Sequence, residues 1–223
     1  MANNAATTEL EAAVRAVRTN SRRRQVLDAA VKVMQRTGFH AMSMQALADE
    51  ADVSVGLIYK YFGGKEDVLL ATIVDILEKF RDQLAPAMAQ APDDPVEQVA
   101  AGFRRYIQII DDNRDAVVLT YRESRTLDAD GRERIKELEV ETSAPLRAAV
   151  EAGVAAGVLT PHDPDLTVFN LLMLAHSWAL KHWHFAALYS VEEFIRAQLE
   201  FVLPTMVVAE RLDEYRHLTA RRP

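Results

Sequence analysis

The residues whose types and spacing suggest chemistry lie within Ser43–Lys65, the segment SMQALADEADVSVGLIYKYFGGK. Met44, Leu47 and Ala48 are spaced i, i+3, i+4, which predicts a short helix with one apolar face. Ser54 is a suitable cap for a second short helix, because its hydroxyl can accept a hydrogen bond from a free backbone N–H. Two short helices at a tight turn are typical of a helix-turn-helix, which lays the start of its second helix against base edges in the major groove. The chemistry predicted here is contact with duplex DNA.

The outward face of the predicted second helix carries small residues first and aromatic and basic residues later. Val55 and Leu57 offer no hydrogen bonds, so direct readout of bases should depend on thymine methyl groups and on Lys60. Polar and basic groups around the motif would contact phosphates, which set register more than sequence. The predicted phosphate contacts are Arg24, Ser43, Tyr59, Tyr61 and Lys65, and the predicted DNA-binding set also includes Ser54, Val55, Gly56, Leu57 and Lys60.

Lys65 has two possible explanations. It stands at the start of a predicted helix, where a cation does not favour the helix dipole. A DNA phosphate would explain its position, and so would a solvated lysine close to Glu66 and Asp67.

The same segment resembles a known family. The pattern Ser-Met-x-x-Leu-Ala-x-x-Ala-x-Val-Ser-x-Gly-x-Ile-Tyr-x-Tyr-Phe-x-x-Lys-Glu-x-Val-Leu, over Ser43–Leu69, resembles the signature of tetracycline-repressor-type (TetR) regulators. The resemblance covers about residues 21–82. Family relatives often carry a basic residue and a threonine where this chain has Val55 and Leu57, so the operator sequence does not follow from it. Without the resemblance, a plain helical hairpin inside an all-helical enzyme would fit the same periodicity.

The net charge of −7 is unevenly distributed. Residues 1–85 hold 11 basic and 11 acidic side chains, whereas the remainder holds 15 basic and 22 acidic ones. Ala12–Leu27 contains five arginines and no acid, namely Arg15, Arg18, Arg22, Arg23 and Arg24. A local basic patch on a neutral domain can attract phosphates, because distant charges are screened. The alternative is a solvated helix face or arm.

The rest of the chain predicts an all-α fold of about nine helices. Residues 1–20 are predicted to form a flexible or partly helical extension, and residues 21–82 a three-helix DNA-binding domain with its helix-turn-helix at about 45–64. The proline-rich break at Pro86–Pro95 is the predicted boundary, after a fourth helix at about Lys65–Leu84. Residues 83–223 are predicted to form a helical bundle for ligand binding and dimerisation.

Two predicted C-terminal helices, Leu166–Ala187 and the last helix of the bundle, carry more apolar side chains than the core of one chain can cover. The segment Leu166–Ala187 is apolar nearly all round, which indicates cover on more than one side. One short recognition helix also reads too few base pairs, and a two-fold pair would read two half-sites. A homodimer closed by a four-helix interface is therefore predicted, as the resemblance also implies. The predicted interface residues are Leu172, Ala179, Ile195, Leu199, Val202 and Met206.

Aromatic and polar residues of the C-terminal part would suit a cavity for a hydrophobic effector. The set is Phe103, Tyr106, Tyr121, Arg122, Phe169, Met173, His176, Trp178 and Trp183. Ordinary core and dimer packing is the alternative for each of them. Val118–Arg125 and Trp178–Trp183 faintly resemble the family members that respond to acyl-CoA esters, in which case Arg122, Arg125 and Lys181 would be available to meet a CoA phosphate.

Several function classes are disfavoured. The chain has no cysteine, and no phosphate-binding glycine loop, nucleophile elbow or zincin motif is present. His182 and His184 point to different helix faces, so no metal is expected.

With no membrane-spanning run and no signal peptide, a cytoplasmic location is predicted. The prediction is a ligand-released, DNA-binding repressor without a cofactor or enzymatic activity, and the alternative is a ligand-binding or enzymatic bundle without regulatory DNA binding.

Overall fold

The structure is a computed structural model that describes the backbone of residues 2–220 and the side chains of residues 17–220. Met1 of the predicted extension, residues 221–223 of the predicted C-terminal domain and the Arg15 side chain lie outside these ranges. Over residues 2–220 the fold is all-α, as predicted, with ten α-helices, two 3-10 helices and one isolated bridge between Leu159 and Val207. No helix in this range is long and apolar enough to cross a membrane.

The chain folds into two compact units, and most contacts between residues lie within one unit or the other. The first comprises the residues up to Ile73 together with Leu119–Asp128, and the second comprises Val74–Val118 together with the chain from Ala129 onward. The division therefore falls inside a helix rather than at the predicted proline-rich break. The functional boundary between residues 82 and 83 stays a prediction.

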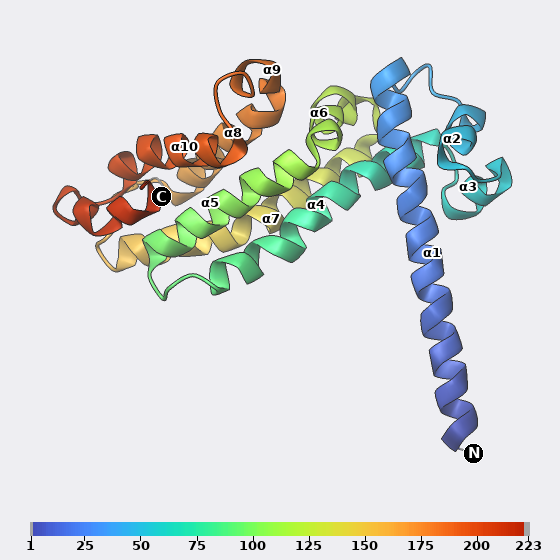
Figure 1. The fold of residues 1–223 in the computed structure, drawn as a ribbon, viewed down its shortest axis with the longest axis horizontal. Helices are drawn as coiled ribbons and strands as arrows, with labels where there is room; N and C mark the ends of the chain where they lie inside the picture. The colour runs from blue at the N-terminus through green and yellow to red at the C-terminus, as the bar shows by residue number, and fades with distance from the viewer. Residues whose placement is uncertain (1, 221–223) are drawn as a thin grey trace. The chain divides into compact units, whose positions relative to one another are not determined.

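The first unit is built from α1 (Ala2–Thr37), α2 (Met44–Ala51), α3 (Val55–Tyr61) and the first turns of α4 (Lys65–Ala89) (Figure 1). The predicted extension of residues 1–20 is part of α1 from Ala2 onward. α1 ends at Thr37, before Gly38, whose φ of 78° is accessible to glycine and whose N–H donates to the Met34 carbonyl at 2.7 Å. The unit's core side chains are Val26, Leu27, Ala30, Met34, Phe39, Leu47, Ile58, Phe62 and Leu69.

α4 continues past the residue at which the sequence predicts its end. It runs through Pro86 to Ala89 instead of stopping at Leu84. A proline inside a helix removes one backbone hydrogen bond, and α4 continues past Pro86 without that bond. Leu84 and Met88, on either side of it, are both buried and hold this end of the helix in place.

The second unit is a helical bundle around α5 (Pro95–Asp112). Asp94 caps α5 by accepting from the N–H groups of Val96 and Glu97 at 2.8 and 3.1 Å. α7 (Ala129–Ala155) and α8 (Pro164–Leu180) both pack against α5. α6 (Arg114–Glu123) and the 3-10 turn η1 (Ser124–Thr126) link α5 to α7 along the chain.

The apolar segment after Leu166 is two helices rather than one. α8 ends at Leu180, and a separate short helix, α9 (His182–Phe185), follows the irregular residue Lys181. α10 (Val191–Met206) begins at the capping box of Ser190 and Glu193, as predicted. The final 3-10 helix, η2 (Ala209–Leu218), was not predicted; Tyr215 attaches it to the start of α5 by donating to Asp94 at 3.0 Å.

Candidate nucleic-acid interface and effector cluster

Local hydrogen bonds fix the turn between α2 and α3. The Ser43 hydroxyl accepts from the N–H of Ala46 at 3.1 Å, and the Ser54 hydroxyl accepts from the N–H of Leu57 at 3.2 Å. Asp52 ends α2 in the left-handed region with φ 49° and ψ 51°, and its N–H bonds to carbonyls of the last turn. Short polar side chains tolerate this conformation better than most. The two caps and this one residue reverse the chain in a few residues and hold α3 at a fixed angle to α2.

α3 is anchored along one side and open on the other. Ile58 is fully buried and Phe62 nearly so, whereas Gly56, Tyr59 and Lys60 are exposed, with 53% of Tyr59 accessible. Val55, Leu57 and Tyr61 are half-buried. Phe62, in extended conformation, ends the helix. The predicted outward face of α3 is therefore present, with its first turn accessible.

α1 supports this hairpin from one side. The Gln25 side chain donates to the Ala51 carbonyl at 2.7 Å, and Arg36 forms an ion pair with Glu50 at 3.2 Å. The guanidinium of Arg23 lies 5.5 Å from the centre of the Phe62 ring. The predicted phosphate contact Arg24 is exposed and borders a crevice of about 500 Å³ between α1 and the end of α2.

Lys65 contacts the loop between α1 and α2, which the sequence did not indicate. Its ammonium donates to the His40 carbonyl at 3.3 Å and lies 4.9 Å from the centre of the Phe39 ring. The lysine therefore braces the α1–α2 loop. An ammonium has three N–H donors, so this bond leaves others for a phosphate.

Four of the predicted effector residues are buried or paired in the second unit, and two of them, Tyr106 and His176, contact each other. Tyr106 stacks on Phe80 of α4 with a centroid distance of 4.1 Å, and its hydroxyl lies 3.3 Å from Nε2 of His176 on α8. Phe103 is fully buried in the same unit. Trp178 is buried too, and its indole N–H donates to Asp111 at 2.9 Å. Phe80 and Asp111 were missed by the sequence analysis, although the helical spacing of Phe80 on α4 marked it as a core residue.

Burial controls the charge of His176. Desolvation lowers its pKa to about 4, partly opposed by a hydrogen bond to the Leu172 backbone. The imidazole is therefore neutral at physiological pH. Tyr106 and His176 thus place two neutral polar groups among aromatic and aliphatic side chains, which is an arrangement suited to orienting a mostly apolar ligand.

The other predicted effector residues do not join this cluster. Tyr121 and Arg122 belong to the first unit, and both are exposed. Phe169 is half-buried, while Met173 and Trp183 are 49% and 78% exposed. Met173 on α8 and Trp183 on α9 are exposed while Phe103 is buried, so the structure does not bring these three side chains together in one cavity.

The predicted dimer residues also need correction. Leu172, Ala179, Ile195, Leu199, Val202 and Met206 are all buried within the single chain. A side chain already covered by its own chain leaves almost no area for a partner. Sequence periodicity could not distinguish the two apolar sides of α8 and α10.

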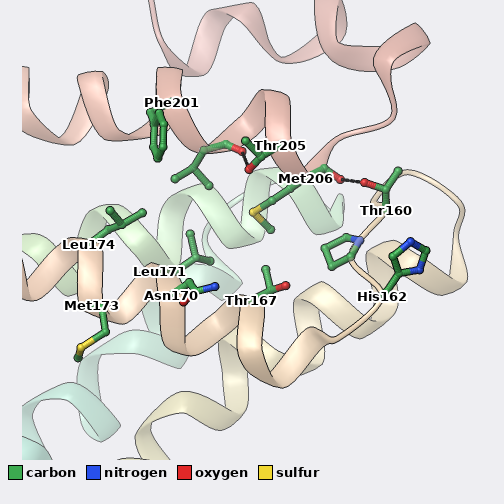
Figure 2. Close-up of a pocket in the computed structure, with 12 residues that line it drawn as sticks. Thr160, His162, Thr167, Asn170, Leu171, Met173, Leu174, Phe201, Thr205 and Met206 are labelled. Carbon is green, nitrogen blue, oxygen red and sulfur yellow. Dashed lines mark hydrogen bonds between the residues drawn. The ribbon is translucent and has the colours of Figure 1, made fainter.

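The outer side of α8 and α10 carries a more exposed apolar surface, and two of the predicted dimer residues, Val202 and Met206, lie along its groove. An open groove of about 740 Å³ lies between these helices and the Thr160–His162 turn (Figure 2). Leu174, Phe201 and Met173 line it, together with polar groups such as Asn170 and Thr205. Phe201 is 65% exposed, and Leu166, near the start of α8, is 57% exposed. We call this the α8–α10 face.

Comparisons with known proteins agree with this architecture. Residues 26–72 match the family described as bacterial regulatory proteins, tetR family, and residues 92–184 match the tetracyclin repressor-like C-terminal domain. The HTH-type transcriptional regulator HbdR of Aromatoleum sp. (strain CIB) is 33% identical over 189 residues, which are 85% of this chain and 82% of HbdR.

Solved structures share the fold. AibR, in a complex with isovaleryl coenzyme A and operator DNA, has a TM-score of 0.71 at 22% identity, over 82% of this chain and 98% of AibR. FadR from Bacillus subtilis, in a complex with stearoyl-CoA, has a TM-score of 0.68 at 21% identity, over 81% of this chain and 97% of FadR. The helix-turn-helix geometry, the two matched domains and the similarity to HbdR lead to one conclusion: the chain belongs to the tetR family of bacterial regulatory proteins.

Proposed function

We propose that this protein is a repressor that binds an operator as a homodimer and leaves it when an acyl-CoA-type effector binds the second unit. The observation that carries the proposal is the capped hairpin of α2 and α3, which exposes the first turn and the Tyr59–Lys60 side of α3. A helix presented in this way fits the major groove. A regulator of this kind acts on the chromosome, so we expect it in the cytoplasm and expect no turnover of a substrate.

DNA contact is assigned to the predicted residues that the fold leaves accessible. Gly56 and Lys60 are exposed on α3 and would face base edges together with half-buried Val55 and Leu57. Tyr59, Tyr61, Arg24 and Lys65 would contact phosphates. The hydroxyls of Ser43 and Ser54 already accept capping bonds, and a hydroxyl can still donate to a phosphate oxygen.

The dimer would form through the α8–α10 face. Its exposed apolar side chains lie beside a groove, and a two-fold interface buries the same patch on both copies. Pairing two copies would also supply the second recognition helix that a two-half-site operator needs. Phe201, Met173 and Leu166 therefore replace the buried residues predicted from sequence as the principal contacts.

The effector class is proposed from the buried cluster and from the relatives. AibR and FadR were solved with isovaleryl coenzyme A and stearoyl-CoA, respectively. In this chain, Phe80 and Tyr106 offer apolar ring surface, while the Tyr106–His176 pair offers a hydroxyl and a neutral imidazole. An acyl thioester combines an apolar chain with a polar carbonyl, so it suits this environment. Tyr121 and Arg122 stay predictions.

A titration with labelled DNA tests the proposal. A duplex selected by the full-length protein from a random pool is titrated without and with isovaleryl-CoA, stearoyl-CoA and free coenzyme A. A coupling of about 1–3 kcal/mol would weaken DNA binding by roughly 5- to 150-fold for one acyl-CoA but not for free coenzyme A. Equal affinities in all arms would reject an acyl-CoA effector.

Two matched variants separate the DNA site from the effector site. Lys60→Ala should weaken binding to the selected duplex and leave acyl-CoA binding unchanged. Lys136→Ala, which removes a lysine that pairs with Glu133 on α7, should alter neither. Absence of salt-dependent binding to any duplex would favour the alternative of a ligand-binding bundle.

A further inference from the structure

α1 is much longer than its contacts with α2 and α3 require. Gln25 and Arg36 are the residues through which it bonds to α2, and Arg23 lies over Phe62 at the end of α3. The turns before these contacts continue away from the hairpin, and Figure 1 shows α1 projecting well beyond α2 and α3. All four side chains from Val17 to Asn20 are exposed. These four side chains are not covered by the rest of the described chain, so they are accessible to a partner.

One edge of this projecting part is basic. Arg18 and Arg22 are four residues apart, so they lie on the same side of the helix. Gln25, three residues after Arg22, extends that edge to the contact with Ala51, and Arg22 donates to Gln25 at 2.9 Å. The edge therefore runs on the side of α1 that faces the hairpin.

The charges on this edge are not neutralised within the described part of the chain. No ion pair joins Arg18 or Arg22 to an acidic group among the side chains of residues 17–220. Both side chains are exposed. This contrasts with Arg36, further along α1, which is paired with Glu50. Arginines left in solvent beside a recognition helix are suited to phosphate oxygens, because their planar N–H groups match that geometry.

The position of the edge relative to α3 decides which phosphates it would meet. Arg23 and Gln25 contact the ends of α3 and α2, so the basic edge starts at the level of the hairpin. Arg18 lies seven residues before Gln25, or about 10 Å along the helix. On a duplex lying along this part of α1, that length would span about three base-pair steps. Arg18 and Arg22 would then meet phosphates beside the groove in which α3 would lie.

We propose that Arg18 and Arg22 bind the DNA backbone beside each half-site, outside the base pairs read by α3. This inference rests on the proposed operator binding and adds a second surface to it. The proposal is confined to these two arginines, because the side chains before Val17 lie outside the described residues. The contact would lengthen the operator without adding base specificity.

The test compares two duplexes and three proteins. The core site is first defined as the base pairs whose substitution changes binding of the full-length protein. Affinity is then measured on a 40-base-pair duplex and on one trimmed to the core, at several salt concentrations. The proteins are the native chain, Arg18→Ala/Arg22→Ala, and Arg18→Lys/Arg22→Lys, which keeps the charge. Lys32→Ala is the matched control, since Lys32 is an exposed basic residue further along α1.

The native chain should bind the long duplex more tightly than the trimmed one. The double alanine variant should lose that preference, and its salt slope on the long duplex should be smaller by about 3 to 4, from two arginines in each of two protomers. The lysine variant and Lys32→Ala should keep most of both properties. Thermal unfolding should not change, because neither arginine is buried.

Other outcomes overturn the inference in distinguishable ways. A native chain that binds both duplexes equally, or an unchanged slope for the double alanine variant, removes the flanking contact but leaves operator binding intact. A change in self-association instead of DNA affinity, seen by sedimentation, would mean that the edge meets a second copy. If the native chain binds no duplex with salt dependence, the proposed function fails together with this inference.

Discussion

At the scale of single residues, His176 stands out because it combines burial with a polar partner. Tyr106 lies within hydrogen-bonding distance of one ring nitrogen, and burial lowers the pKa of the imidazole to about 4. The ordinary value of histidine is about 6.5. The folded protein therefore resists protonation of His176 across an interval in which the unfolded chain accepts the proton.

Stability should depend on pH because of this residue. Between pH 6.5 and 4 the unfolded state binds more protons at this site than the folded state, so the free energy of unfolding should fall as pH falls. The loss from His176 alone would be up to about 3 kcal/mol. Urea unfolding of the native chain and of His176→Gln between pH 7.5 and 4 measures it. The variant should show a shallower dependence, and parallel curves would contradict the prediction.

At the scale of elements, local capping signals were the most predictable feature. Ser54, Asp94 and Ser190 cap the helices that their positions in the sequence indicate, whereas the cap formed by Ser43 was not predicted. A cap depends on a side chain and a backbone group within three residues, so the sequence holds all the information. The outward side of α3 was also predictable from the sequence. Once Ile58 is buried, the helical spacing fixes which residues of α3 face away from the core.

Features that depend on distant contacts were not predictable. α4 passes through Pro86 because Leu84 and Met88 are buried against other parts of the fold. α8 is apolar on both sides, so the sequence could not indicate that Leu172 faces the core and Phe201, across on α10, faces outward. The bond from Lys65 to the His40 carbonyl could not be predicted either, because the loop after α1 brings the two groups together.

The packing of α5 against its neighbours depends on a glycine. A Cβ atom at Gly102 would lie 2.7 Å from a methyl carbon of Leu146 on α7 and 2.9 Å from the sulfur of Met88 on α4. These separations are shorter than van der Waals contact, so the ends of the Leu146 and Met88 side chains would have to shift to admit a larger residue. Gly102 thus lets both side chains pack directly against the α5 backbone.

Gly102→Val should destabilise the second unit. Overpacking of this kind costs about 1–3 kcal/mol, and valine is not favourable enough in a helix to offset it. Ala85→Val, at an exposed position of α4, is the matched control and should cost less than about 1 kcal/mol. Chemical denaturation of both variants gives the comparison. Similar midpoints for the two would mean that Met88 and Leu146 move aside freely.

At the scale of the whole molecule, charge is divided along the chain as the proposed function requires. The acidic excess lies after residue 85, and the earlier part is neutral with a basic run of arginines. An acidic C-terminal part repels DNA, which favours contact through the helix-turn-helix end. Two recognition helices are still needed, so the proposed function depends on the α8–α10 face.

Phe201→Glu should disrupt the dimer. Phe201 is 65% exposed beside the groove, and a two-fold interface through this face would bring two copies of the introduced carboxylate into an apolar contact. Burying an unpaired charge is costly, so the variant should sediment as a monomer at micromolar concentration. Its affinity for a duplex with two half-sites should fall to that of a single half-site.

Val140→Glu supplies the control for this experiment. Val140 is an apolar side chain of α7 that is 50% exposed, so the substitution adds the same charge to a different face. It should leave both the sedimentation coefficient and DNA affinity unchanged. If Val140→Glu became monomeric while Phe201→Glu stayed dimeric, the interface would lie on α7. If neither variant altered a stable dimer, a surface remote from both residues would have to hold the copies together, and the assignment to the α8–α10 face would be wrong.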